Sequence, residues 1–100
     1  MTTPVVVRKR AKRHILDATS WYTNISRNLG EDFVAAVDDA IESARNYPLA
    51  YPVIYRLLRR VLLRRFPYAL FYRFKDNRVV IIAVLHQARD PRLLRGSDVV

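Results

Sequence analysis

The chain has 100 residues, a length that suits one folded domain and excludes a multidomain enzyme. Hydrophobic residues make up 51% and glycines number two, a composition that excludes a disordered chain. There is no apolar run near the ~20 residues that a membrane helix needs, and there is no cysteine for a disulfide or a thiolate site. We therefore expect one cytoplasmic domain over residues 1–100 that does not contact a membrane.

The formal net charge is +9, and the two halves of the chain share it unequally. Residues 1–50 carry seven Lys or Arg against six Asp or Glu, whereas residues 51–100 carry eleven against three. Fifteen of the eighteen cations are Arg, whose planar guanidinium suits two-point contacts with phosphate and carboxylate groups. This distribution predicts a polyanionic target, an acidic protein partner, or both. The alternative is an arginine-rich surface with no target.

A short strand followed by a helix is predicted at the start of the chain. Val5–Val7 is a β-branched run typical of a strand. Apolar side chains then recur every three or four residues, the period of an amphipathic helix, at Ala11, Ile15, Ala18, Tyr22, Ile25 and Leu29. Gly30 is predicted to cap the end of this helix. We interpret Trp21 and Tyr22 as core residues.

A second helix is predicted up to Pro48. Its apolar stripe has the same period, at Phe33, Val37, Ala40, Ile41, Ala44 and Tyr47. Glu31 and Asp32 are expected in its first turn, where the helix dipole favours anions. The other acidic side chains are expected to form a solvated face, at Asp38, Asp39 and Glu42. Because so few residues separate the two helices, they should form an antiparallel hairpin.

The remainder of the chain predicts a sheet. Residues 63–66 alternate weakly, residues 69–75 are aromatic, and Asp76-Asn77 is typical of a hairpin turn. Val79–Leu85 is apolar on both faces, as expected of a central strand. The predicted fold is α+β: an N-terminal strand and an antiparallel helical hairpin packed on a small sheet, which a three-strand antiparallel meander completes. The expected core includes Ile15, Tyr22, Phe33, Val37, Ile41, Val80 and Ile82.

Few catalytic chemistries fit these residues. His14 and His86 lie in separate elements, so we expect no metal site, and nothing in the sequence indicates a cofactor. The serines lack a nucleophile-elbow context. Cleavage of RNA without a metal stays open, because it needs only a base, an acid and cations at the phosphate. His86 suits such a role at the end of the central strand, although a histidine there also serves as a structural hydrogen-bonding group.

Motifs along nearly the whole chain resemble the RelE/ParE toxin superfamily. They are Ile15-Leu16-Asp17, Trp21-Tyr22, Leu29-Gly30 with Phe33, Tyr47-Pro48, Tyr51-Pro52, Arg64-Arg65-Phe66-Pro67-Tyr68, Phe71-Tyr72-Arg73, Val79–Leu85, and His86 with Arg89-Asp90-Pro91. The resemblance implies the toxin of a bacterial type II toxin–antitoxin pair. Its partner would be a ParD-like antitoxin with an acidic segment that folds on binding, giving a toxin–antitoxin hetero-oligomer of the kind used in plasmid stabilisation.

The superfamily has two branches with different chemistry. RelE-like members cleave mRNA on the ribosome, whereas ParE-like members poison DNA gyrase and are not nucleases. This chain lacks the strand lysines of the RelE pattern, has Ala69 where that pattern has arginine, and has no tyrosine after Tyr72. Its Val84-Leu85-His86-Gln87 segment is similar to the ParE ending, so the resemblance favours a gyrase inhibitor without catalytic residues.

Two alternatives stay open: an mRNA endonuclease, and a stand-alone nucleic-acid-binding module. In the endonuclease, the catalytic residues would be Arg65, Tyr68, His86 and Arg89. For the gyrase inhibitor, the candidates for target binding are the basic side chains of the second half: Arg59, Arg60, Arg64, Arg65, His86, Arg89, Arg92 and Arg95. We expect some of these arginines to pair instead with Asp76, with Asp90 or with the antitoxin.

Overall fold

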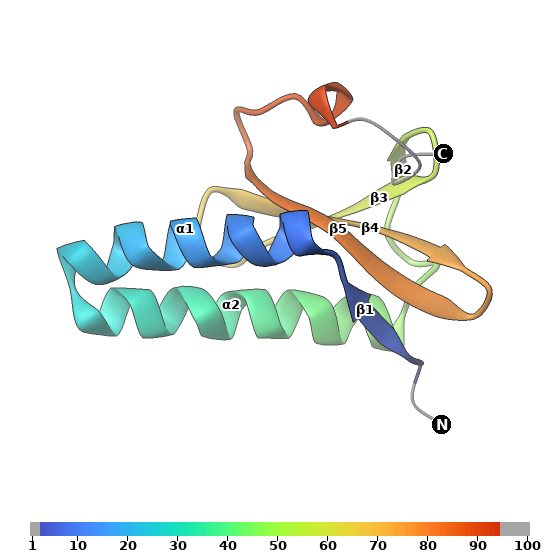
Figure 1. Ribbon diagram of the computed structural model, residues 1–100. Helices are drawn as coiled ribbons and strands as arrows, with labels where there is room; N and C mark the ends of the chain where they lie inside the picture. Colours follow the sequence, from blue (N-terminus) through green and yellow to red (C-terminus); the bar gives the residue numbers. More distant parts are fainter. Residues whose placement is uncertain (1–2, 95–100) are drawn as a thin grey trace.

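The computed structural model describes residues 3–94 and places two helices beside a five-stranded sheet (Figure 1). The elements in chain order are β1 (Val5–Val7), α1 (Lys9–Ile25), α2 (Arg27–Asn46), β2 (Val53–Tyr55), β3 (Leu58–Leu62), β4 (Tyr68–Lys75), β5 (Arg78–His86) and a short 3-10 helix, η1 (Pro91–Leu93). The α+β class and the helical hairpin are confirmed. None of the helices among the described residues is long and apolar enough to cross a membrane.

The strand order in the sheet is β1-β5-β4-β3-β2. β1 pairs with β5 in parallel, with Val5 opposite Val79, and the other neighbouring strands are antiparallel. The predicted three-strand meander is therefore present, but its first strand is β3 at Leu58–Leu62, whereas the weakly alternating residues 63–66 lie in the turn before β4. β2 extends the meander by one short strand that sequence analysis missed. Asp76 and Asn77 form the predicted turn between β4 and β5 with positive φ angles of 54° and 59°, as a tight hairpin turn requires.

The central strand β5 contains a bulge that changes which side chains face the helices. Phe71 of β4 lies opposite Ala83, whereas the next residue, Tyr72, lies opposite Ile81, so Ile82 is the extra residue. Ile82 and Ala83 consequently both face away from the helices, and the alternation resumes one residue out of step. The bulge thereby turns Val84 to the helix side.

The connection between the helices differs from the prediction. α1 ends at Ile25, Ser26 is extended, and α2 begins at Arg27. Gly30 therefore lies inside α2 and does not cap α1, and Glu31 and Asp32 both lie beyond the first turn of α2. A Cβ at Gly30 would lie 2.0 Å from Thr23 Oγ1 of α1, so the glycine allows the two helices to approach closely.

The helices and the sheet enclose an aromatic core. Phe33 is fully buried, and its ring lies 5.2 Å from the rings of Tyr22, Phe66 and Tyr68, measured between centroids. Such stacked and edge-to-face pairs stabilise a core beyond their buried area. Tyr22 is confirmed as part of the core. The interpretation of Trp21 is wrong, because its side chain is 66% exposed on α1.

A second core covers the opposite face of the sheet. Phe71, Val80 and Ile82 pack there with Leu58, and Leu94 from the segment after η1 is buried among them. Val79–Leu85 is buried along its whole length, as predicted for a central strand. The chain after β5 returns over this face of the sheet (red in Figure 1), where Leu94 is buried.

Candidate functional site

The predicted basic residues do not form one cluster. Arg59 of β3 is partly buried, and its guanidinium donates to the carbonyl of Tyr51 at 2.6 Å. Tyr72 of β4 donates to the carbonyl of Pro48 at 2.6 Å. These two side chains therefore hold the segment between α2 and β2 against the sheet. Burial raises the pKa of Tyr72 to about 12, although the charge of Arg59 opposes this shift.

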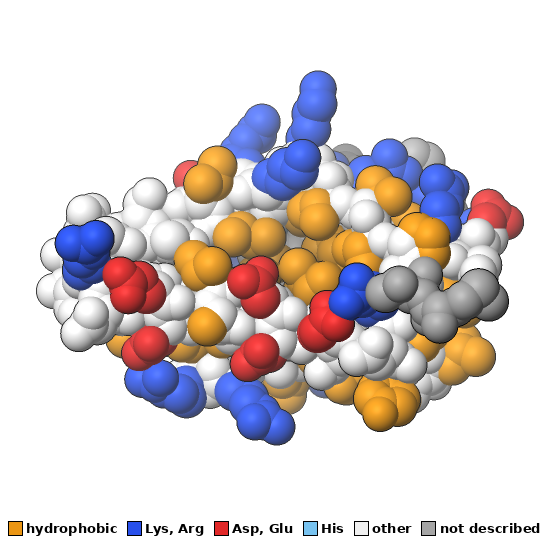
Figure 2. Space-filling model, turned by 90° about the horizontal axis from the view of Figure 1, so that it is seen from below, with side chains coloured by type: hydrophobic (Ala, Val, Ile, Leu, Met, Phe, Trp, Pro, Cys, Tyr) orange, Lys and Arg blue, Asp and Glu red, His pale blue; other side chains and the backbone are white. Residues whose placement is uncertain are grey.

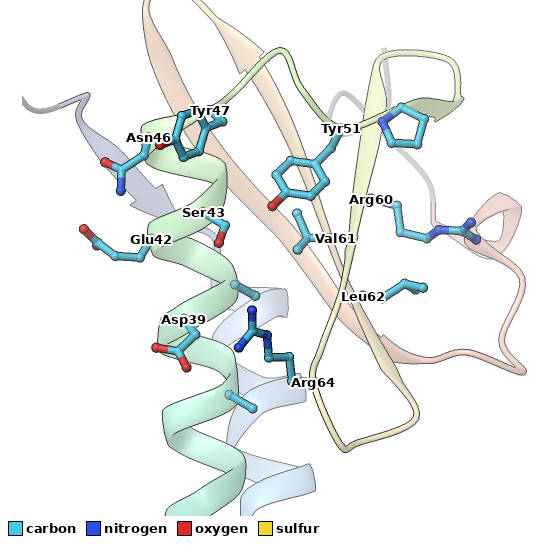
Figure 3. Close-up of a pocket in the computed structure, with 13 residues that line it drawn as sticks. Asp39, Glu42, Ser43, Asn46, Tyr47, Tyr51, Arg60, Val61, Leu62 and Arg64 are labelled. Atoms are coloured by element: carbon cyan, nitrogen blue, oxygen red, sulfur yellow. The ribbon is translucent and has the colours of Figure 1, made fainter.

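The turn between β3 and β4 carries two exposed arginines. Arg65 has a φ of 71°, pairs with Asp32 of α2 at 3.2 Å, and lies over the ring of Phe66. Arg64 is exposed beside it. Arg65 is thus tied to the helical layer, whereas the guanidinium of Arg64 extends toward α2 without a recorded ion pair within residues 3–94 (Figure 3).

A groove of about 720 Å³ runs between α2 and β3. Tyr51 and Val61 point across it toward α2, whereas Arg60 and Leu62 point away (Figure 3). We call this surface the α2–β3 groove; its lining is Ala36, Asp39, Ala40, Glu42, Ser43, Asn46, Tyr47, Tyr51, Pro52, Arg60, Val61, Leu62 and Arg64. Figure 2 shows acidic side chains spread over the face of the molecule seen from below, with hydrophobic side chains exposed between them. The groove therefore has an apolar floor and acidic groups on its α2 wall, and opposite them is the guanidinium of Arg64 from the turn after β3.

A smaller cavity of about 300 Å³ lies where α1 passes the end of β5. We call it the β5-end pocket; its lining is His14, Asp17, Ala18, Trp21, Tyr68, Val84, Leu85, His86 and Arg89. Three of the four residues of the endonuclease alternative line it, namely Tyr68, His86 and Arg89. Arg65, the fourth, is not part of the lining.

Backbone hydrogen bonds hold both histidines of this pocket. The N–H of Val84 donates to His14 Nδ1 at 3.2 Å, and the N–H of Ala88 donates to His86 Nδ1 at 3.1 Å. The His14 contact caps an N–H on the edge of β5 that lies beyond the last partner in β1. The ring of Tyr68 packs edge-on against His86 at 5.4 Å and restricts its position.

The electrostatic surroundings of His14 are positive. Burial and the charges of Arg10 and Arg89 lower the pKa of His14, and the charge of Asp17 opposes them. Neutral His14 is also the form whose Nδ1 can accept from Val84. An anion in this pocket would meet guanidinium and imidazole donors together.

Two further candidates occupy the tail. Arg92 forms a two-point ion pair with Asp90, with its Nη2 at 2.7 Å from Oδ2, which confirms that one of the arginines pairs with Asp90. This pair lowers the pKa of Asp90. Arg95 lies outside the described residues. The described part of the chain holds no group of three His, Asp or Glu side chains that suits a metal ion.

Sequence analysis missed two features of these surfaces. His14 and Trp21 join His86 only because of the bulge in β5 and the path of α1. The α2–β3 groove could not be predicted from the sequence, because its floor consists of small and apolar residues that are indistinguishable in sequence from core residues.

Comparisons with known proteins agree with this fold. A family model described as "ParE toxin of type II toxin-antitoxin system, parDE" matches residues 5–91. A solved structure described as the chromosomal ParDE TA system from P. aeruginosa is similar in fold, with a TM-score of 0.63 and 17% identity, over 84% of this chain and 95% of that chain. A search of curated proteins found no match. Since the family model spans most of the sequence, the chain belongs to the ParE toxin family of type II toxin–antitoxin systems.

Proposed function

We propose that this toxin inhibits DNA gyrase by binding and is neutralised by an acidic antitoxin segment. One observation favours binding over RNA cleavage: Arg65, which the endonuclease needs at the phosphate, is paired with Asp32 and does not line the β5-end pocket. Tyr68 is packed among the rings of Tyr22, Phe33 and His86, which limits its use as a proton donor.

Inhibition by binding requires a preference for one state of the target. A protein that binds the gyrase–DNA cleavage state more tightly than the resting state raises the population of broken DNA in proportion to that preference. A tenfold preference needs about 1.4 kcal/mol, within reach of one additional charged hydrogen bond. Arg89 is exposed beside His86 and takes part in no ion pair within residues 3–94, so it can supply such a contact.

The α2–β3 groove suits the antitoxin. Its apolar floor fits the apolar side of an amphipathic segment, and Arg64, from the turn after β3, fits an acidic side chain of that segment. The net charge of +9 would attract an acidic chain from a distance, so association should be fast and sensitive to salt. The occupant we propose is the acidic segment of the protein encoded beside this toxin.

Two assays on the purified toxin separate the target hypotheses. The first follows gyrase supercoiling and the trapping of broken DNA, and the second follows translation-dependent cleavage of mRNA. Trapped broken DNA with intact mRNA supports gyrase inhibition. Cuts at codon positions in mRNA, with gyrase unaffected, would overturn it and make Tyr68, His86 and Arg89 catalytic candidates.

The antitoxin site is tested by two variants with the same change of charge. Arg64→Glu alters the wall of the groove, whereas Arg78→Glu alters an exposed position at the start of β5. We expect Arg64→Glu to weaken binding of the neighbour-encoded protein about tenfold more than Arg78→Glu, since a like charge then faces its carboxylates. Equal effects would refute the groove as the docking site, and association that is indifferent to ionic strength would refute the role of charge.

A further inference from the structure

The β5-end pocket contains more hydrogen-bond donors than a structural role explains. His14 and His86 come from elements far apart in sequence, and the Nδ1 atom of each accepts a hydrogen bond from a backbone N–H. A neutral imidazole that accepts at Nδ1 carries its proton on Nε2. The pocket lining therefore includes two Nε2–H donors in addition to the guanidinium of Arg89.

The charge around these donors favours an anion. Arg10, Arg13 and Arg89 all act on His14 through their charges, whereas Asp17 is the one acidic side chain in the lining. Phosphate suits such a site well, because it accepts several hydrogen bonds and guanidinium binds it at two points.

An aromatic side chain at the same pocket narrows the ligand further. Trp21 lines the pocket and is 66% exposed, so the face of its ring is accessible to a ligand. Unpaired nucleobases stack on exposed aromatic rings of this kind. The volume of about 300 Å³ is at the lower end of the range for small-ligand sites, roughly 300–1,000 Å³.

We propose that the β5-end pocket binds one nucleotide of a single strand of DNA. The phosphate accepts hydrogen bonds from His14 Nε2, His86 Nε2 and Arg89, and the base stacks on Trp21. Exposed Arg13 and Lys9 on α1 lie along the same helix and attract neighbouring phosphates. This inference goes beyond gyrase inhibition, because it requires DNA alone and is tested without gyrase.

The experiment uses the tryptophan fluorescence of the whole protein, which has Trp21 as its one tryptophan. An oligothymidylate is titrated into the protein at several salt concentrations, with inorganic phosphate and a glutamate-rich peptide as parallel titrants. We expect the oligothymidylate to quench the fluorescence, whereas the peptide causes little change. The logarithm of the binding constant falls linearly with the logarithm of the salt concentration, and for a single strand each lost phosphate contact makes this slope shallower by about 0.7.

The variants isolate each contact. Arg89→Ala should weaken binding about tenfold and lower the salt slope by about 0.7, whereas Arg78→Ala, an equal loss of charge, should weaken it less. His14→Asn keeps an acceptor near Val84 and removes Nε2, and His86→Asn does the same at Ala88. Labelled oligothymidylate reports the binding of Trp21→Ala by anisotropy, where a loss of at least fivefold is expected from stacking.

Thermal unfolding of each variant identifies any variant that fails to fold. If a histidine variant does not fold, the test depends on the variants at the exposed residues Arg89 and Trp21. Equal losses for Arg89→Ala and Arg78→Ala would overturn the proposal in favour of diffuse charge. Quenching by the glutamate-rich peptide as strong as that by DNA would overturn it in favour of an acidic protein ligand. An absence of quenching by DNA would also overturn it.

Discussion

The α2–β3 groove and the β5-end pocket differ in what builds them. Two layers of the fold form the groove, so its width depends on how α2 packs on the sheet through Phe33 and its neighbours. The pocket lies where α1 passes the end of β5, and its shape depends on a bulge at Ile82 and on one backbone hydrogen bond to each histidine. The groove has an apolar floor between charged walls, whereas the pocket is small and supplies donors.

In the functions proposed above, the two surfaces have separate tasks. A long groove with an apolar floor suits a protein segment, which gains affinity from buried area. A small pocket with convergent donors suits one anionic group of a larger target. Substitutions can therefore separate neutralisation from activity, and those that affect the packing between the layers should disturb the groove first.

The largest effect is expected from Phe33→Ala. This change removes a fully buried ring that contacts Tyr22, Phe66 and Tyr68, so the free energy of unfolding should fall by about 3–5 kcal/mol. Urea denaturation provides the measurement, and Val34→Ala at the neighbouring, exposed position is the control. Similar losses for the two variants would contradict the described core.

Gly30→Ala should have the next largest effect. The added Cβ would lie 2.0 Å from Thr23 Oγ1 and 3.1 Å from Thr23 Cα, so α1 and α2 must separate. We expect a net loss of about 1–3 kcal/mol, although alanine favours a helix. Thr23→Ala in the same chain should recover part of this loss by removing Oγ1. An increase in stability for Gly30→Ala alone would show that the helices are not in close contact there.

Tyr72→Phe should cost about 1 kcal/mol at neutral pH, because it removes the hydrogen bond to the carbonyl of Pro48 at one end of the groove. Its pKa is raised to about 12 from an ordinary value near 10. The stability that this shift contributes is full below pH ~10 and is lost as the pH rises through ~12. The free energy of unfolding, measured over that pH range, should fall more steeply for the wild type than for the variant. Parallel curves would contradict the burial of the phenol.

The smallest effect on stability is expected from His14→Asn. Burial and the charges of Arg10, Arg89 and Arg13 lower its pKa against the opposing charge of Asp17. A lowered pKa contributes stability above the ordinary value of about 6.5, and this stability is lost as the pH falls through the folded-state value. We expect His14→Asn to flatten the acid side of the stability curve. An unchanged acid limb in thermal unfolding would argue against the contact with Val84.

Periodicity in the sequence was enough to predict most of the fold. The two apolar stripes, the β-branched run at Val79–Leu85 and the turn at Asp76-Asn77 each indicate their element through local physics. The predicted end of the first helix was wrong, because Gly30 allows a close contact between the two helices that the local sequence does not reveal. β2 was missed because it has three residues and depends on pairing with β3.

The candidate surfaces were harder to predict. Strict alternation along β5 from Val79 would place His86 on the face away from the helices, and the bulge at Ile82 reverses this. Trp21 was assigned to the core because aromatic residues beside an apolar stripe are most often buried. The sequence alone predicted that Arg59 and Arg65 are available for target binding. Their partners, Tyr51 and Asp32, come from other parts of the fold.

The trapping of broken DNA by gyrase in the presence of the Arg89→Lys toxin tests the central claim most directly. Lysine keeps the charge but loses the planar, two-point geometry of the guanidinium. We predict that Arg89→Lys traps several-fold less broken DNA than the wild type, that Arg78→Lys equals the wild type, and that both variants still bind the neighbour-encoded protein. Full trapping by Arg89→Lys, or a parallel loss of antitoxin binding, would contradict the account.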